Sequence, residues 1–151
     1  MTAHVGTSSV TAHVRSNSVT AHVRSNSVTE PDARQRGLAK MKEVYGWDMP
    51  DVPGDYYKYT IEHLFGTIWC RPELSLRDRR LLLLGAVSAM GLDDILDLQI
   101  TAALNNEELT DDEMREVALF LTHYVGWPLG QKVYMTAEKA IEKRKKAAGH
   151  G

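Results

Sequence analysis

Cysteine is nearly absent from this chain, which has Cys70 alone among 151 residues. A single cysteine excludes a disulfide within one chain and any redox pair of cysteines in one subunit. Such cysteine usage is typical of a reducing compartment, and we expect a cytoplasmic protein. The N-terminus lacks a basic segment followed by an apolar one, so no secretory signal is predicted. The longest apolar run, 81–90, is too short to span a bilayer.

An excess of either charge is also missing. The chain has 18 lysines and arginines against 20 aspartates and glutamates, a formal net charge of −2. This balance indicates neither a nucleic acid nor a membrane as partner. The hydrophobic fraction of 43% and the charged fraction of 25% are typical of a globular protein. The length suits one domain with a core of its own.

Residues 2–28 contain no acidic residue and repeat with a period of nine, as TAHVGTSSV and then TAHVRSNSV twice. Three short copies rich in Ser, Thr and Asn cannot bury a core. We therefore interpret 1–29 as a low-complexity, disordered tail and 30–151 as the domain. A metal site is the alternative, because the repeat contains His4, His13 and His22. Histidines nine apart on a flexible chain lack ligand geometry, so we expect no metal and no cofactor.

No segment alternates apolar and polar residues with period two for long, so strands are not predicted. Apolar residues instead recur at helical spacing between start and stop signals. Ser75 with Asp78, and Thr110 with Glu113, form capping boxes that begin two of the helices. We predict an all-α domain of about six helices, over 33–45, 55 to the break at Pro72, 75–90, 93–105, 110–124 and from 129 onward.

Two of these helices carry further expectations. The run 81–90 is apolar almost all round, which places its helix in the centre of a bundle or between subunits. The helix over 93–105 is expected to turn one face inward, formed by Ile95, Leu96, Ile100, Ala103 and Leu104. In the first helix, Leu38, Met41 and Tyr45 share one side.

Two segments carry a family resemblance. They are FGTIWCRPELSLRDRR, over 65–80, and AALNNEELTDDEMREVALFLTHYVGWP, over 102–128. Both resemble signatures of the carboxymuconolactone decarboxylase family, which also contains the alkylhydroperoxidase D-like proteins. The resemblance implies a six-helix, alkylhydroperoxidase D-like bundle that oligomerises through its helices. It also implies a homo-oligomer, commonly a trimer or hexamer, with pockets near subunit interfaces.

The reactive groups of the family differ in this chain. In the peroxidase branch, a Cys-x-x-Cys pair and a following His precede the AAL segment. Alignment on that segment places Leu92 and Ile95 at the cysteine positions and Gln99 at the histidine. Peroxide reduction needs a reactive thiolate and a resolving thiol, so this activity is disfavoured. Gln99 can hydrogen-bond a substrate but cannot shuttle a proton.

Three residues are the candidates for catalysis, namely His123, Gln99 and Arg80. His123 is an acid/base candidate, because histidine is the side chain whose ordinary pKa lies nearest neutral pH. The alternative for His123 is a helix-terminal or interface histidine that hydrogen-bonds a carbonyl. Arg80 lies well inside its helix, where a guanidinium suits a carboxylate substrate, and salt bridges are the alternative.

The candidates for substrate binding are Arg79, Trp69, Trp127, Tyr124 and Cys70. The two tryptophans either line an apolar pocket or pack in a core or interface. Cys70 is either a nucleophile activated by its basic neighbours or a structural cysteine.

Two functions follow from these observations. The first is a decarboxylase-like enzyme that acts on a small carboxylic acid or lactone, with Gln99 and His123 in the pocket. The second is a non-catalytic, oligomeric binding or scaffold protein on the same fold, because fold resemblance alone does not decide activity. The expected partners are a small-molecule substrate and further copies of the chain.

Overall fold

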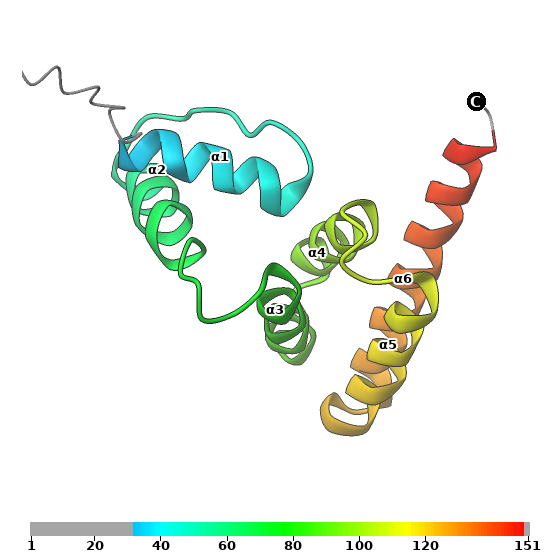
Figure 1. Ribbon diagram of the computed structural model, residues 1–151. Coiled ribbons are helices and arrows are strands. Elements are labelled where there is room, and N and C mark those ends of the chain that lie inside the picture. Colours follow the sequence, from blue (N-terminus) through cyan, green and yellow to red (C-terminus); the bar gives the residue numbers. More distant parts are fainter. Residues whose placement is uncertain (1–31, 150–151) are drawn as a thin grey trace, which may run out of the picture.

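The computed structural model describes residues 32–149, so the predicted tail over 1–29 lies outside the described part. All regular elements between these bounds are helices, as the sequence predicts (Figure 1). Helices α3 and α4 lie between two flanking groups, α1 with α2 on one side and α5 with α6 on the other (Figure 1). The bounds are α1 Ala33–Tyr45, α2 Asp55–Lys58, η1 Tyr59–Ile68, α3 Leu76–Met90, α4 Asp93–Asn105, α5 Asp111–Val125 and α6 Trp127–Ala148.

Helix α1 has the predicted bounds because both of its ends are capped. The Asp32 carboxylate accepts a hydrogen bond from the backbone N–H of Gln35 at 2.8 Å. Gly46 ends the helix with φ of 85°, a left-handed conformation that glycine adopts without strain. Met41 and Val44 are buried with Ile61 and Phe65 in a small apolar cluster between α1 and η1.

The segment after α2 departs from an ordinary α-helix. Over η1 the chain forms a π-helix, and its last turn shows the wider spacing: the N–H of Trp69 donates to the carbonyl of Leu64 at 2.9 Å. More than four residues therefore fill each turn, which changes the inward face. Ile61 and Phe65 are buried, whereas Leu64 and Tyr59 are exposed.

Helices α3 and α4 contribute residues to the larger of the two apolar clusters. The capping box of Ser75 and Asp78 is present, and Gly91 ends α3 with φ of 66°. Leu84, Leu96 and Ile100 are buried in a cluster that α5 and α6 complete. The apolar run in α3 is not buried all round within one chain, because Leu82 and Met90 are 65% and 69% exposed.

The expectation that Ile95 of α4 faces inward is wrong. Ile95 is 42% exposed, whereas the four other residues predicted to face inward are buried, namely Leu96, Ile100, Ala103 and Leu104. Helical geometry explains the difference, since Ile95 lies one position, about 100°, before Leu96. The buried stripe begins at Leu96, which packs in the cluster that α4 shares with α3 and α6.

Helices α5 and α6 form an antiparallel pair. The predicted capping box of Thr110 and Glu113 begins α5. Helix α6 begins at Trp127, two residues before the predicted start, because Pro128 is accommodated in the first turn, where its missing N–H costs nothing. Met114, Ala118, Val133 and Ala137 are buried in the larger cluster.

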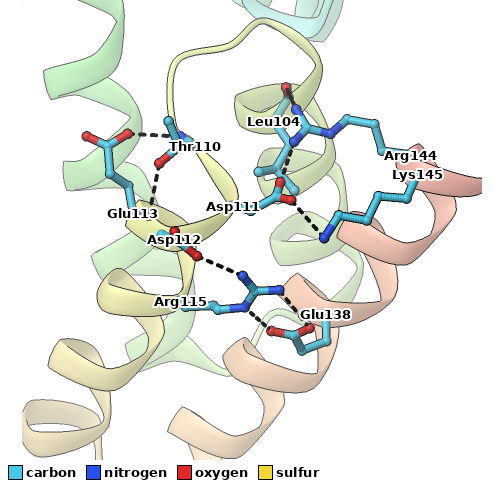
Figure 2. Close-up of polar contacts among 9 residues, drawn as sticks. All are labelled: Leu104, Thr110, Asp111, Asp112, Glu113, Arg115, Glu138, Arg144 and Lys145. Atoms are coloured by element: carbon cyan, nitrogen blue, oxygen red, sulfur yellow. Dashed lines mark hydrogen bonds and ion pairs between the residues drawn. The ribbon is translucent and has the colours of Figure 1, made fainter. Parts of the chain in front are cut away.

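Ion pairs join α5 to α6, and a hydrogen bond from Arg144 joins α6 to α4 (Figure 2). Arg115 donates two hydrogen bonds to Glu138, at 2.6 and 3.3 Å, and lowers the pKa of that carboxyl. Burial alone would raise the pKa of Asp111, but Lys145 and Arg144 together lower it. Arg144 also donates to the Leu104 carbonyl at 2.7 Å. We call these residues the α5–α6 clasp.

The clasp predicts a pH-dependent loss of stability. Because the pKa of Glu138 is lowered in the folded chain, its contribution to stability is present above the unfolded pKa of about 4.3. It is lost as pH falls through the folded pKa. We expect Glu138→Gln to lower the urea midpoint at pH 7, and the difference from the parent to shrink below about pH 4.

Urea unfolding followed by circular dichroism between pH 7 and pH 2 measures this difference. The matched control is Glu142→Gln, because Glu142 is 68% exposed and only loosely paired with Lys146 at 3.9 Å. A constant difference between parent and Glu138→Gln over the whole pH range would contradict an ionic contribution.

Candidate functional site

A cavity of about 580 Å³ lies where α1 and η1 meet α3 and α4. Most of its wall is aromatic or aliphatic, which suits a compact organic molecule. Polar atoms reach it from a few side chains, chiefly Tyr45, Arg79 and Gln99. The complete lining is Tyr45, Tyr56, Thr60, Leu64, Phe65, Ile68, Trp69, Leu74, Arg79, Leu82, Leu83 and Gln99.

A buried ion pair lies behind Gln99. The Arg80 side chain is 0% exposed, and its guanidinium donates two hydrogen bonds to Glu108, at 2.8 and 2.9 Å. It also donates to the Val44 carbonyl of α1 and to the side-chain oxygen of Gln99. Two parallel hydrogen bonds to a carboxylate are the strong, geometrically specific form of this pairing. Arg80 is therefore neutralised and held in one position.

Arg80 determines the orientation of the Gln99 amide. A guanidinium has donors only, so the group that faces it must be the amide oxygen. The NH₂ group of Gln99 is therefore directed away from Arg80. Gln99 is 3% exposed and lines the cavity, so its two N–H donors are available there and near Tyr45. The result is an oriented amide donor in an apolar cavity.

Tyr45 is a residue of this site that the sequence analysis placed only on one side of its helix, with Leu38 and Met41. Its ring lies 5.7 Å from that of Phe65 and 5.9 Å from that of Trp47, between centroids. Burial raises the pKa of the Tyr45 phenol, and the hydrogen bond from Gln99 and the charge of Arg80 oppose that shift. Its position at the C-terminal end of α1, beside a loop, was the available signal.

Arg79 supplies the cation at the cavity wall. Its Nη2 donates to the Arg71 carbonyl at 2.7 Å, and within residues 32–149 it forms no salt bridge. The remaining guanidinium donors can therefore bind an anion. Its charge also contributes to the lowered pKa of Glu73, after the stronger contribution of Arg71. Arg79 thus differs from Arg80, which a carboxylate already neutralises.

The structure brings together four of the predicted site residues. Gln99, Arg79 and Trp69 line the cavity, and Arg80 lies directly behind Gln99. The Trp69 ring stacks on Phe65 with 5.8 Å between centroids, so it contributes an apolar surface to the cavity wall. Cys70 does not line this cavity; its thiol is exposed and donates to the Phe65 carbonyl at 3.2 Å.

Within one chain, His123 and Gln99 do not line the same cavity, and their expected grouping stays a prediction. His123 is exposed in the last turn of α5, and its Nδ1 lies 2.9 Å from the Leu119 carbonyl. Tyr124 contacts Phe120 on the same helix, with 4.9 Å between ring centroids. Trp127 lines a second cavity, of about 560 Å³, between α5 and α6. Residues at this end of α5 do not line the Gln99 cavity.

Residues 32–149 contain neither a metal-binding group of side chains nor a membrane-spanning helix. No group of three or more His, Cys, Asp or Glu side chains in that range is placed to hold a metal ion. Within the same range, no helix combines the length and the apolar character that crossing a membrane requires.

Comparison with known proteins agrees with the fold. The sequence profile of the carboxymuconolactone decarboxylase family matches residues 54–138. The chain is also similar to a 4-carboxymuconolactone decarboxylase of Acinetobacter baylyi, with 27% identity over 116 residues. That alignment covers 72% of this chain and 86% of the relative. The matched region contains η1, most of the cavity wall, Arg80 and Gln99. The chain belongs to the carboxymuconolactone decarboxylase family.

Proposed function

We propose that this protein is a decarboxylase-like enzyme that acts on a small carboxylic acid or lactone in the cavity beside Gln99. The observation that carries this proposal is the oriented Gln99 amide, whose NH₂ group is directed away from Arg80 in a largely apolar cavity. Arg79, free of any carboxylate partner in the described chain, provides the cation that an acidic substrate needs. Similarity to a decarboxylase supports the reaction class.

The charge movement of a decarboxylation fits these groups. When the bond to the carboxylate breaks, carbon dioxide leaves and the electron pair passes to a conjugated carbonyl, which becomes an enolate. Fixed N–H donors at that oxygen stabilise the developing charge without reorganising. Gln99 provides such donors because Arg80 and Glu108 hold its amide in one orientation. Arg79 binds the acid and orients it in the cavity.

Carbon dioxide release from carboxymuconolactone and related lactone acids tests the proposal. We expect turnover by the parent, and Arg79→Leu to raise KM by about 10- to 100-fold through loss of charged hydrogen bonds. The matched control is Lys58→Leu, which removes an exposed cation near the cavity without changing its lining. No release from any of these acids, while they still bind, would favour the non-catalytic binding protein.

We further propose that the protein is a homo-oligomer, as its family resemblance implies. Large apolar side chains of α5 and α6 are exposed in the single chain, including Phe120 at 57%, Tyr124 at 76% and Trp127 at 73%. Phe120 and Tyr124 contact one another, and exposed apolar side chains that gather on a surface mark association sites. Light scattering tests the proposal, and a mass near that of one chain, 16.9 kDa, would contradict it.

A further inference from the structure

Three O–H groups line the cavity, those of Tyr45, Tyr56 and Thr60, and the proposed charge stabilisation uses none of them. Thr60 donates to the Tyr56 carbonyl at 2.9 Å and Tyr56 is 79% exposed, so the half-buried phenol of Tyr45 is the O–H group best placed to act on a bound substrate. We propose that Tyr45 is the catalytic acid of this site, delivering a proton from its Oη to the carbon that loses carbon dioxide. The inference rests on the proposed function and adds the residue that completes the reaction. Neither His123 nor Cys70 takes this role in the single chain, because neither lines the cavity.

The direction of the hydrogen bonds around Tyr45 is the first argument. Glu108 accepts from Arg80, and Arg80 donates to the Gln99 oxygen, so the NH₂ group of Gln99 is the part that can face Tyr45 in the cavity that both residues line. An NH₂ group can only donate to the Tyr45 oxygen, so Gln99 leaves the phenolic hydrogen free. A phenol held in this way presents its O–H to the cavity.

Packing around the ring is the second argument. The Tyr45 ring is enclosed by Trp47 and Phe65, with centroids 5.9 and 5.7 Å away, so the phenol is held at the cavity wall. Burial raises the pKa of the phenol, which keeps it protonated at neutral pH. An enolate carbon is a stronger base than a phenolate, so proton transfer from Tyr45 runs downhill.

The proposed step is balanced. Cleavage of the carbon–carboxylate bond releases carbon dioxide and leaves the electron pair in the enolate. The enolate carbon then forms a C–H bond with the Tyr45 proton, and the resulting phenolate takes a proton from water. The sum is one carboxylate and one proton converted to one C–H bond and carbon dioxide, with no oxidant or reductant.

Tyr45→Phe tests the step because it keeps the ring and its packing and removes only the hydroxyl. We expect kcat to fall about 100- to 10,000-fold, the range for loss of a general acid, with KM changed less than about threefold. The matched control is Tyr59→Phe, since Tyr59 is 70% exposed and does not line the cavity. Equal urea midpoints for parent and Tyr45→Phe show that folding is intact.

Product labelling gives a readout that a merely structural role would not change. In D₂O the parent should place one deuterium at the decarboxylated carbon with a single configuration. Residual turnover by Tyr45→Phe should give both configurations, because water then supplies the proton from either side. Gln99→Glu should also lower kcat, since a carboxylate beside Tyr45 would accept the phenolic hydrogen.

The two proposals fail differently. If the parent releases no carbon dioxide, the decarboxylase function is wrong and the Tyr45 step is wrong with it. If the parent is active and Tyr45→Phe keeps kcat within about threefold and a single configuration, only the Tyr45 proposal is overturned.

Discussion

Glu108→Gln is expected to lower the free energy of unfolding by about 3 to 5 kcal/mol, the cost of removing one partner from a buried ion pair. The Arg80 side chain is 0% exposed and that of Glu108 is 5% exposed, so water cannot replace the lost carboxylate. The guanidinium is permanently charged, and it cannot relieve the cost by losing its proton. An uncompensated positive charge would remain between α1, α3 and α4.

Urea unfolding at pH 7 measures this loss, and two other variants isolate its cause. Glu73→Gln removes a carboxylate from an exposed pair with Arg71, so it should leave the midpoint unchanged. The double variant Arg80→Met/Glu108→Leu removes both charges and should recover most of the stability, as replacement of a whole buried pair often does. A Glu108→Gln midpoint equal to that of the parent would contradict the assignment.

The Arg80–Glu108 ion pair is expected to affect the proposed activity as well as the stability. Arg80 and Asn106 both donate to the Val44 carbonyl at the end of α1, the latter at 3.1 Å. Asn106 also donates to Glu108 at 3.1 Å. These contacts attach the α1–η1 cluster to the larger helical cluster at the place where the cavity lies. Loosening them would misplace Tyr45 and release the Gln99 amide, so kcat should fall in any Glu108 variant that still folds.

Helix ends could be predicted from the sequence because their signals are local. The two capping boxes, of Ser75 with Asp78 and Thr110 with Glu113, need residues three apart, and both are present. Gly46 ends its helix because glycine adopts a left-handed conformation without strain, and this depends on one residue alone. The family resemblance likewise rests on continuous segments, and the matched region over 54–138 confirms it.

The site could be predicted only in part because it depends on residues far apart in the chain. Gln99 is predicted from its place in the family pattern, whereas Arg79 and Trp69 are predicted from the chemistry of their side chains. The partner of Arg80 was not, since Glu108 lies 28 residues away and is one of several glutamates near a helix start. The π-helical turns of η1 give no periodic signal of their own, so the sequence does not predict that Phe65 is buried while Leu64 is exposed.

Gly37→Ala should lower the free energy of unfolding strongly, because Gly37 of α1 lies against the backbone of η1. A Cβ at residue 37 would lie 1.9 Å from the carbonyl oxygen of Ile61 and 2.6 Å from its carbonyl carbon. Both atoms belong to the backbone, so relief requires η1 to move away from α1. Overpacking of a core costs about 1 to 3 kcal/mol, and a clash with rigid backbone belongs at the upper end of that range.

Gly85→Ala is the matched control, because Gly85 is also inside a helix but has space around it. Its added Cβ would lie 3.8 Å from Leu121, an ordinary contact. Both substitutions gain the same helix propensity, up to about 1 kcal/mol, so only Gly37→Ala carries the clash. We expect Gly85→Ala to match or exceed the parent in urea midpoint and Gly37→Ala to fall well below it. Displacing η1 would also move Phe65 and Trp69, so Gly37→Ala should raise KM for the acid substrate. Equal midpoints for the two alanine variants would show that α1 and η1 are not held at this distance.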